Sequence, residues 1–234
     1  MVRHAANRAG AGVNVATIPF PISRPSEVLD AIDREIDSST RLLVVDHITS
    51  PTGLVFPIRQ IVERARDRGV RMLVDRAHTP GMVSIDLNAI NADYSTGNHH
   101  KWWCAPKASG FLWVRRQWHS EVRPNVISHA ANRPIDGRSQ FVSEFDWKGT
   151  FDPSALLSVP AAIEFLASLM PGGISGLMQA NRQLAIRSRD HLCHSLGIVP
   201  PAPDEMLGSL VALPISPTDR PLQKLKRTIT NAAN

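Results

Sequence analysis

Two strand-like runs separated by one amphipathic helix constrain the fold of this chain most strongly. The run Arg41–Asp46 is almost continuously apolar after its first residue, which is typical of a strand buried on both faces of a parallel sheet. Pro57 suits the first turn of a helix that carries one apolar face and ends near Gly69. The run Val70–Asp75 then reads as the next strand. This order predicts a βαβ unit and an α/β domain with a mainly parallel sheet.

Further elements are predicted on both sides of this unit. Short strands are expected at residues 13–19, 92–96, 110–114 and 209–214. Helices are expected at residues 26–36, 152–169 and 174–196, because apolar residues recur there at helical spacing. Ser26 is the predicted N-cap of the first of these helices.

The composition is that of an ordinary globular protein, with 43% hydrophobic and 20% charged residues. The formal net charge is +5, but the basic residues are scattered, so no nucleic-acid partner is expected. No apolar run reaches the roughly 18 residues of a membrane span, and the N-terminus lacks the apolar region of a signal peptide. We therefore expect a cytoplasmic protein with no membrane partner. Cys104 and Cys193 form no CxxC pair, which predicts neither a disulfide framework nor a zinc site.

Polar side chains follow three of the predicted strands. Asp46 and His47 end the first, Asp75 and His78 end or follow the second, and the segment Asn98–Lys101 follows the third. Ligands of open α/β sheets bind beyond the carboxyl ends of the strands. A single aspartate at a strand end is more often a turn or cap residue, and a His-His-Lys run is more often a solvated loop. The histidines also lack the spacing of a known metal motif, so no metal is expected.

Taken together, these side chains suit a lysine Schiff base with pyridoxal 5'-phosphate (PLP). An amine must lose its proton to attack a carbonyl carbon, and a desolvated, partly cationic pocket favours that state. A carboxylate that faces the pyridine nitrogen keeps it protonated and makes the ring an electron sink. Lys101 and Asp75 are the candidates for these two roles. A Rossmann dehydrogenase is disfavoured because no GxGxxG follows a predicted strand.

Several separated motifs lie in one order along the chain. They are Asp46–Pro57, Leu73–His78, Asp93–Tyr94, Thr96–Trp102, Ala105–Leu112 and Glu144–Pro153. This order resembles the class V aminotransferase superfamily, which consists of PLP-dependent enzymes of fold type I, and within it the isopenicillin N epimerase-like proteins. The resemblance extends from about residue 5 to residue 213.

The resemblance implies a three-layer large domain and the start of a small C-terminal α+β domain. Residues 1–150 would be the PLP-binding domain without its N-terminal part, and residues 151–234 the interdomain helices with a partial small domain. The phosphate loop and stacking side chain that usually precede this core, and the carboxylate-gripping arginine that follows it, are not found. The chain is therefore expected to be truncated at both ends.

Roles at the cofactor ring follow from the same resemblance. Lys101 would form the Schiff base, and Asp75 would pair with the pyridine nitrogen. His78 would lie against the phenolic oxygen of the ring, and Ser50 matches a polar position near that oxygen. Arg76 stands where such proteins usually have glycine, and its guanidinium is expected either to compete for the carboxylate of Asp75 or to point to solvent.

The resemblance also implies residues for the phosphate and a second subunit. Asn98 and His100 stand where phosphate-binding residues precede the lysine, and Thr150 resembles the residue that reaches the phosphate of the neighbouring subunit. A homodimer is therefore implied. Two further departures are Ser109, in place of a usual glycine, and His99, at a position that is often small.

The function that the resemblance implies is PLP chemistry at the α-carbon of an amino acid or peptide-like amine, as an epimerase, aminotransferase or lyase. One alternative is a fragment that keeps the PLP-site residues with weak or no turnover. Another is a cysteine desulfurase-like or hercynylcysteine sulfoxide lyase-like enzyme. A desulfurase needs a nucleophilic cysteine on a mobile loop, and neither Cys104 nor Cys193 is well placed for that role.

Overall fold

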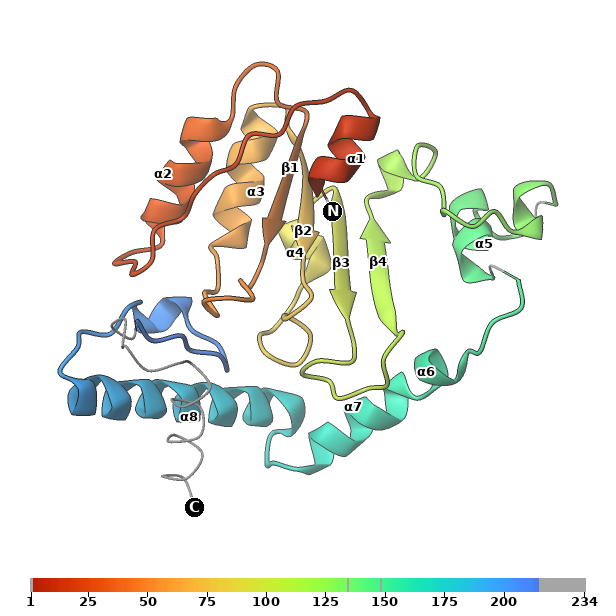
Figure 1. Ribbon diagram of the computed structural model, residues 1–234. Coiled ribbons are helices and arrows are strands. Elements are labelled where there is room, and N and C mark those ends of the chain that lie inside the picture. Colours follow the sequence, from red (N-terminus) through yellow and green to blue (C-terminus); the bar gives the residue numbers. More distant parts are fainter. Residues whose placement is uncertain (1, 134, 148, 215–234) are drawn as a thin grey trace.

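A four-stranded sheet forms the centre of the protein (Figure 1). The computed structural model describes residues 2–133, 135–147 and 149–214. The strands are β1 (Leu42–Asp46), β2 (Arg71–Asp75), β3 (Tyr94–Asn98) and β4 (Gly110–Val114), in that spatial order. The first three are parallel and β4 runs antiparallel to β3. The predicted βαβ unit and mainly parallel sheet are confirmed.

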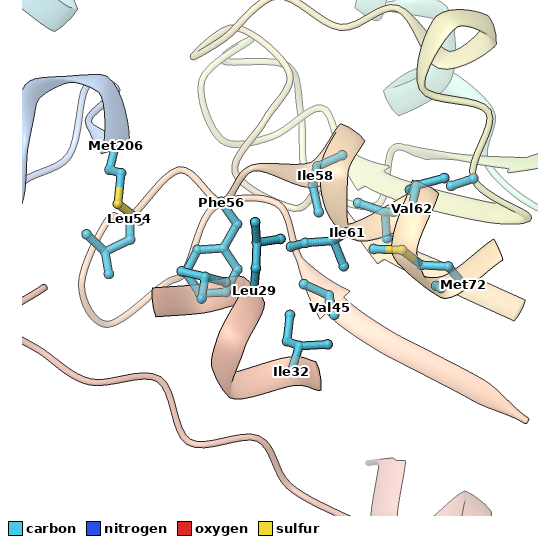
Figure 2. Packing of buried hydrophobic residues seen from close by; sticks show 14 of the residues in the cluster. Leu29, Ile32, Val45, Leu54, Phe56, Ile58, Ile61, Val62, Met72 and Met206 are labelled. Carbon is cyan, nitrogen blue, oxygen red and sulfur yellow. The ribbon is translucent and has the colours of Figure 1, made fainter. Parts of the chain in front are cut away.

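Helices α2 (Ser26–Glu35) and α3 (Ile58–Asp67) supply most of the helical part of the core. The predicted apolar face of α3 is buried, and in Figure 2 its residues Ile61 and Val62 lie near Val45 of β1 and Met72 of β2. Burial of an aliphatic side chain of this size contributes about 1.5–3 kcal/mol to folding. Met206, from a segment far along the chain, closes the same core beside Leu54 (Figure 2).

The opposite face of the sheet is more open. Side chains of a strand alternate between faces, and those of Val45, Met72 and Val74 point to the core. The alternate residues Leu42 and Val44 of β1 point to the other face, where they are 48% and 37% exposed. The expectation that β1 is buried on both faces is therefore wrong, because within the described ranges α2 and α3 cover the face that carries Val45.

The second half of the chain is mostly helical. Its long helix α8 (Gly173–Leu196) runs across the view of Figure 1 beyond the carboxyl ends of β1 to β3. Arg182 and Arg189 of α8 donate to the carbonyl oxygens of Leu207 (3.0 Å) and Ala202 (3.2 Å), which holds the segment around Met206 in place. The other helices are α1 (Val2–Arg8), α4 (Leu87–Ile90), α5 (Gln140–Asp146), α6 (Ser154–Leu157) and α7 (Val159–Ser168), with 3-10 turns at Arg116–Trp118, His129–Ala131 and Asp204–Met206.

Several expected elements differ from the structure. Residues 13–19 and 209–214 form no strand, because neither segment pairs with a neighbouring strand in the parts of the chain that are described. The predicted helix at 152–169 is divided at Ser158, since Pro160 has no amide to continue the helical hydrogen bonds. β3 begins at Tyr94, two residues later than expected.

The N-cap predicted at Ser26 is also wrong. Ser26 is the first residue of α2, and no side chain caps the helix from Pro25. Instead, Oε1 of Glu27 accepts hydrogen bonds from the backbone amides of Ser23 (2.9 Å) and Arg24 (3.1 Å). The turn before the helix is thus fixed from inside the helix.

Over the described residues, no single helix is both long and apolar enough to cross a bilayer. Residues Ser154–Ser168 and Gly173–Leu196 meet the length and hydropathy requirement only as a pair bent by 66°.

Candidate functional site

The ends of β1 and β2 carry polar residues on both faces of the sheet. Asp46 and Asp75 are partners in the parallel register, so their side chains share one face. The residue that directly follows each strand points to the opposite face. These residues are His47 after β1 and Arg76 after β2, and both are buried. The polar residues that sequence reasoning grouped in one site therefore form two layers.

Lys101 and His78 meet on the side of Asp75. The Nζ atom of Lys101 lies 2.9 Å from Nε2 of His78. Burial, and then the positive charge of Lys101, lower the pKa of His78, while Asp75 opposes this shift. A neutral imidazole accepts a hydrogen bond from the lysine amine through Nε2, which leaves the proton on Nδ1. That Nδ1 atom is buried and has no hydrogen-bond partner among the described residues.

The carboxylate of Asp75 is oriented by its own loop. Oδ1 accepts a hydrogen bond of 2.8 Å from the backbone amide of Ala77, which leaves the other oxygen for a ligand. The backbone carbonyl of Asp75 accepts from the amide of His47 at 2.7 Å. The half-buried aspartate is thus held at both its main chain and its side chain.

Asp46 joins this site, although sequence reasoning did not select it. It keeps solvent access, but desolvation by the surrounding protein and the negative charge of Asp75 raise the pKa of its carboxyl group, which the charge of Lys101 partly offsets. The signal was the same as for Asp75, an aspartate that ends a strand. The register that places the two side by side was not visible in the sequence.

The loop that carries Lys101 is locked against the loop after β2. The imidazole of His99 stacks on the rings of Trp103 (5.2 Å between centroids) and Phe111 (6.0 Å). Gly81 has a φ of +82°, and a Cβ atom there would come within 2.7 Å of the backbone carbonyl of Trp102. Only glycine fits this close approach, so Gly81 determines how near the two loops can come.

Arg76 neither competes for Asp75 nor points to solvent, so both expectations for it are wrong. Its side chain is 0% exposed and lies on the core face, because adjacent strand residues point to opposite faces. Nη1 lies 2.6 Å from Nδ1 of His47, and Nε donates to Oγ of Ser95 at 3.3 Å. Nη2 is buried and has no partner in the described parts of the chain.

The charges of this buried pair are set by desolvation. Burial lowers the pKa of Arg76 to about 10, so the guanidinium stays protonated at neutral pH. Burial, and then the charge of Arg76, lower the pKa of His47 to about 3. His47 is therefore neutral at neutral pH, and its Nδ1 accepts the hydrogen bond from Arg76.

The remaining candidate residues are spread more widely. Asn98 ends β3, and His100 lies between it and Lys101 with a buried Nδ1 that has no partner among the described atoms. Ser50 and Thr150 are exposed, and no hydrogen bond in the described ranges joins either to Lys101 or Asp75. The structure thus brings the side chains of Lys101, His78 and Asp75 close together, and the roles of Ser50 and Thr150 stay predictions.

The chemistry of these donors fits PLP. One amine is available for an aldehyde carbon and one carboxylate oxygen for a pyridinium N–H. The unpaired buried Nδ1 atoms of His78 and His100 are free donors or acceptors for ring or phosphate oxygens. No group of three or more His, Cys, Asp or Glu side chains that could hold a metal occurs in the described residues.

Comparison with known protein families places the chain. A model described as aminotransferase class-V matches residues 2–220. The chain belongs to the class V aminotransferase family. It is 35% identical over 224 residues to isopenicillin N epimerase of Amycolatopsis lactamdurans, which covers 91% of this chain and 56% of that protein. It is 33% identical to a putative L-cysteine desulfhydrase of Oryza sativa subsp. japonica, over 87% of this chain and 43% of that protein.

The fold is shared with a cysteine desulfurase of Thermococcus onnurineus NA1, solved in its apo form. The TM-score is 0.67 at 16% identity, over 87% of this chain and 50% of that one. The expected family and its α/β fold of type I with a mainly parallel sheet are thus confirmed. The class V chain spans about half the length of the curated relatives that it matches.

Proposed function

We propose that this class V chain provides the PLP-binding residues of an enzyme that acts at the α-carbon of an amino acid or peptide-like amine. The observation that carries the proposal is the contact of 2.9 Å between Lys101 Nζ and His78 Nε2, beside a strand that ends in Asp75. Members of this family depend on PLP, which supports the same cofactor here.

Each side chain has a proposed task toward the cofactor. Lys101 would bind its aldehyde carbon, and Asp75 would accept a hydrogen bond from its pyridine nitrogen. His78 and Ser50 would bind the ring oxygen. Asn98 and His100 would bind the phosphate, together with Thr150 from a neighbouring subunit. Bound PLP supplies an electron sink for negative charge at the substrate α-carbon.

His78 orients the amine of Lys101. Since burial and the lysine charge favour the neutral imidazole, Nε2 accepts from Nζ and directs it. Once its ammonium proton is lost, the amine could remove a proton from the substrate α-carbon. Delivery of a proton from the opposite face by a second donor would give epimerisation, whereas loss of a β-substituent would give a lyase.

The choice among these reactions rests on the relatives and the cysteines. The similarity to an isopenicillin N epimerase favours proton transfer at the α-carbon, and the similarity to a desulfhydrase favours loss of a β-substituent. A desulfurase reaction needs a nucleophilic cysteine, and Cys193 does not suit that role because it is buried in α8. The alternative outcome is a chain that binds PLP with weak or no turnover.

A homodimer with a small amino-acid substrate belongs to the same proposal. Thr150 is exposed, which supports a role toward a second subunit. We place the cofactor-binding part at residues 1–150, the interdomain helices with a partial small domain at residues 151–234, and the protein in the cytoplasm.

The absorption spectrum of the purified protein tests the proposal. Added PLP should give a visible band that is absent in Lys101→Ala and retained in Lys107→Ala, which removes an exposed lysine of the same loop. Absence of the band in the parent protein would contradict the proposal.

The reaction is then identified from two products. Deuterium incorporated at the α-carbon of an amino acid in heavy water, seen by NMR, reports epimerisation or exchange. Sulfide released from L-cysteine reports lyase chemistry. If neither product exceeds the level formed by Lys101→Ala, the chain binds PLP without catalysing either reaction.

A further inference from the structure

The reverse side of the site holds a buried cation that has no carboxylate partner among the described residues. Arg76 is 0% exposed, and its described side-chain contacts are the imidazole of His47 and the hydroxyl of Ser95. Burial of a guanidinium without an anion destabilises a fold. The guanidinium is nevertheless held by a hydrogen bond to His47 on one side and to Ser95 on the other.

The two partners of Arg76 come from the two strands that flank β2. His47 follows β1 directly, and Ser95 lies in β3. One planar guanidinium therefore joins β1, β2 and β3 near their carboxyl ends. The core face of the sheet carries this link, while Asp75 occupies the other face.

Backbone hydrogen bonds connect the residues of this link to Asp75 and Thr96. The amide of His47 donates to the carbonyl oxygen of Asp75, and the amide of Arg76 donates to that of Thr96, each at 2.7 Å. Asp75 thus lies between two interstrand hydrogen bonds whose donors are the residues that meet on the core face. The peptide units that make these two hydrogen bonds thus belong to the same residues that form the Arg76–His47 contact.

The geometry points to Arg76 as a positioning residue that holds Asp75 from the reverse face of the sheet, through His47 and Ser95. For Asp75 as a cofactor ligand, this inference rests on the proposed function. A guanidinium suits this role because its planar fork fixes Nε toward Ser95 and Nη1 toward His47, whereas the donors of a lysine share one nitrogen on a flexible stem.

Amide hydrogen exchange of the cofactor-free protein tests the positioning directly. In Arg76→Met, the amides of His47 and Arg76 should exchange at least about tenfold faster than in the parent, after correction for global stability by urea unfolding. Arg189→Met is the matched control. Arg189 lies in α8 and is also buried, but its contacts are with Ala202 and Asp204, which follow that helix. Arg189→Met should leave both amides at the parent rate after the same correction.

Milder variants keep the test decisive if Arg76→Met does not fold. Ser95→Ala retains the cation and removes one partner, and should speed exchange of the Arg76 amide selectively. Arg76→Lys should fall between the parent and Arg76→Met. In a double-mutant cycle with His47→Leu, the effects of the two substitutions on the PLP dissociation constant should be non-additive by a factor of about three or more.

The outcomes separate this inference from the proposed function. If Ser95→Ala and the Arg76 variants change these amides no more than Arg189→Met does, Arg76 is only a core residue and the inference fails. If the amides respond but the parent protein binds no PLP, the positioning stands and the proposed function fails. Weaker PLP binding in Arg76→Met together with selective exchange supports both.

Discussion

His47 carries a pH dependence that the fold imposes on it. Its pKa is about 3 in the folded protein and about 6.5 in an unfolded chain. Between these values the unfolded chain binds the extra proton, so the free energy of unfolding decreases as the pH falls from about 6.5 toward 3. The slope from this one group reaches about 1.4 kcal/mol per pH unit.

Replacing His47 with glutamine should flatten this acid-induced loss, since the amide oxygen can accept from Arg76 but does not titrate in this range. Urea unfolding at pH 7, 6 and 5 measures the slope. His191→Gln, at an exposed position of α8, is the control and should keep the parent slope. An unchanged slope in His47→Gln would show that the imidazole is not held neutral.

Asp46 should change the free energy of unfolding with pH in the opposite direction to His47. Its folded pKa is raised by desolvation and by Asp75, so its contribution to stability is lost as the pH rises through that value. Asp46→Asn removes a like charge beside Asp75 and should increase the free energy of unfolding at pH 7 by only about 0.5 kcal/mol or less, because Asp46 is exposed and solvent screens the repulsion. The gain should disappear near pH 3.

For Asp37, replacement by asparagine should have the opposite effect on stability at pH 7. The pKa of Asp37 is lowered by hydrogen bonds from Ser39 and Thr40, so Asp37→Asn should reduce stability at pH 7. Urea unfolding of both variants at pH 7 and pH 3 makes the comparison. Equal responses of Asp46→Asn and Asp37→Asn would contradict the assigned environments.

At the scale of residues, the chemistry and order of Lys101, Asp75 and His78 along the chain predicted that they lie close together, as they do, while their roles toward a cofactor stay predictions. The position of Arg76 could not be inferred in the same way. Whether a strand-end arginine faces solvent or core depends on which face of the sheet the helices cover, and that is a property of tertiary packing. Asp46 was missed for a related reason, since only the strand register pairs it with Asp75.

At the scale of elements, the approach of two loops fixes where Lys101 lies. Gly81→Ala should destabilise the fold by more than the strain of about 1 kcal/mol expected for alanine at positive φ, because the new methyl group meets Trp102 and Trp103. It should also speed amide exchange in residues 99–105. The measurements are urea unfolding and exchange followed by mass spectrometry.

The matched control is Gly69→Ala. Gly69 also has a positive φ, of +69°, but nothing lies within 4 Å of a Cβ atom built there. This variant should show the strain alone and leave exchange in residues 99–105 at the parent rate. Equal behaviour of the two variants would mean that the contact at Gly81 does not position the lysine loop.

Elements were predictable where a local pattern matched the final packing. The amphipathic face of α3 and the apolar run of β2 indicate their own burial, and both occur as expected. Residues 13–19 and 209–214 have the apolar composition of strands, but a strand also needs a neighbour with free backbone groups. That condition lies outside any local window of sequence.

At the scale of the whole molecule, apolar side chains remain on the surface of the C-terminal helices. Leu157 is 74% and Phe165 63% exposed on α6 and α7. Apolar surface of this kind favours association in water. The double variant Leu157→Lys with Phe165→Lys should therefore shift the protein toward the monomer, as measured by sedimentation velocity across a range of protein concentrations.

The control for this shift is Ile127→Lys, which changes an equally exposed apolar residue outside these helices. It should leave the association constant of the parent unchanged. A parent protein that sediments as a monomer at all concentrations would rule out the association and, with it, the proposed homodimer.

The division of the strand ends into two layers has a consequence for how β2 can change over evolution. A substitution within Arg71–Asp75 alters one side chain and leaves the others on their faces. The insertion or deletion of a single residue before Asp75 would instead exchange Asp75 and Arg76 between the two faces, with a carboxylate in the core and a guanidinium on the face that carries Asp46. A change in the length of β2 should therefore disturb the two layers more than a change in its composition.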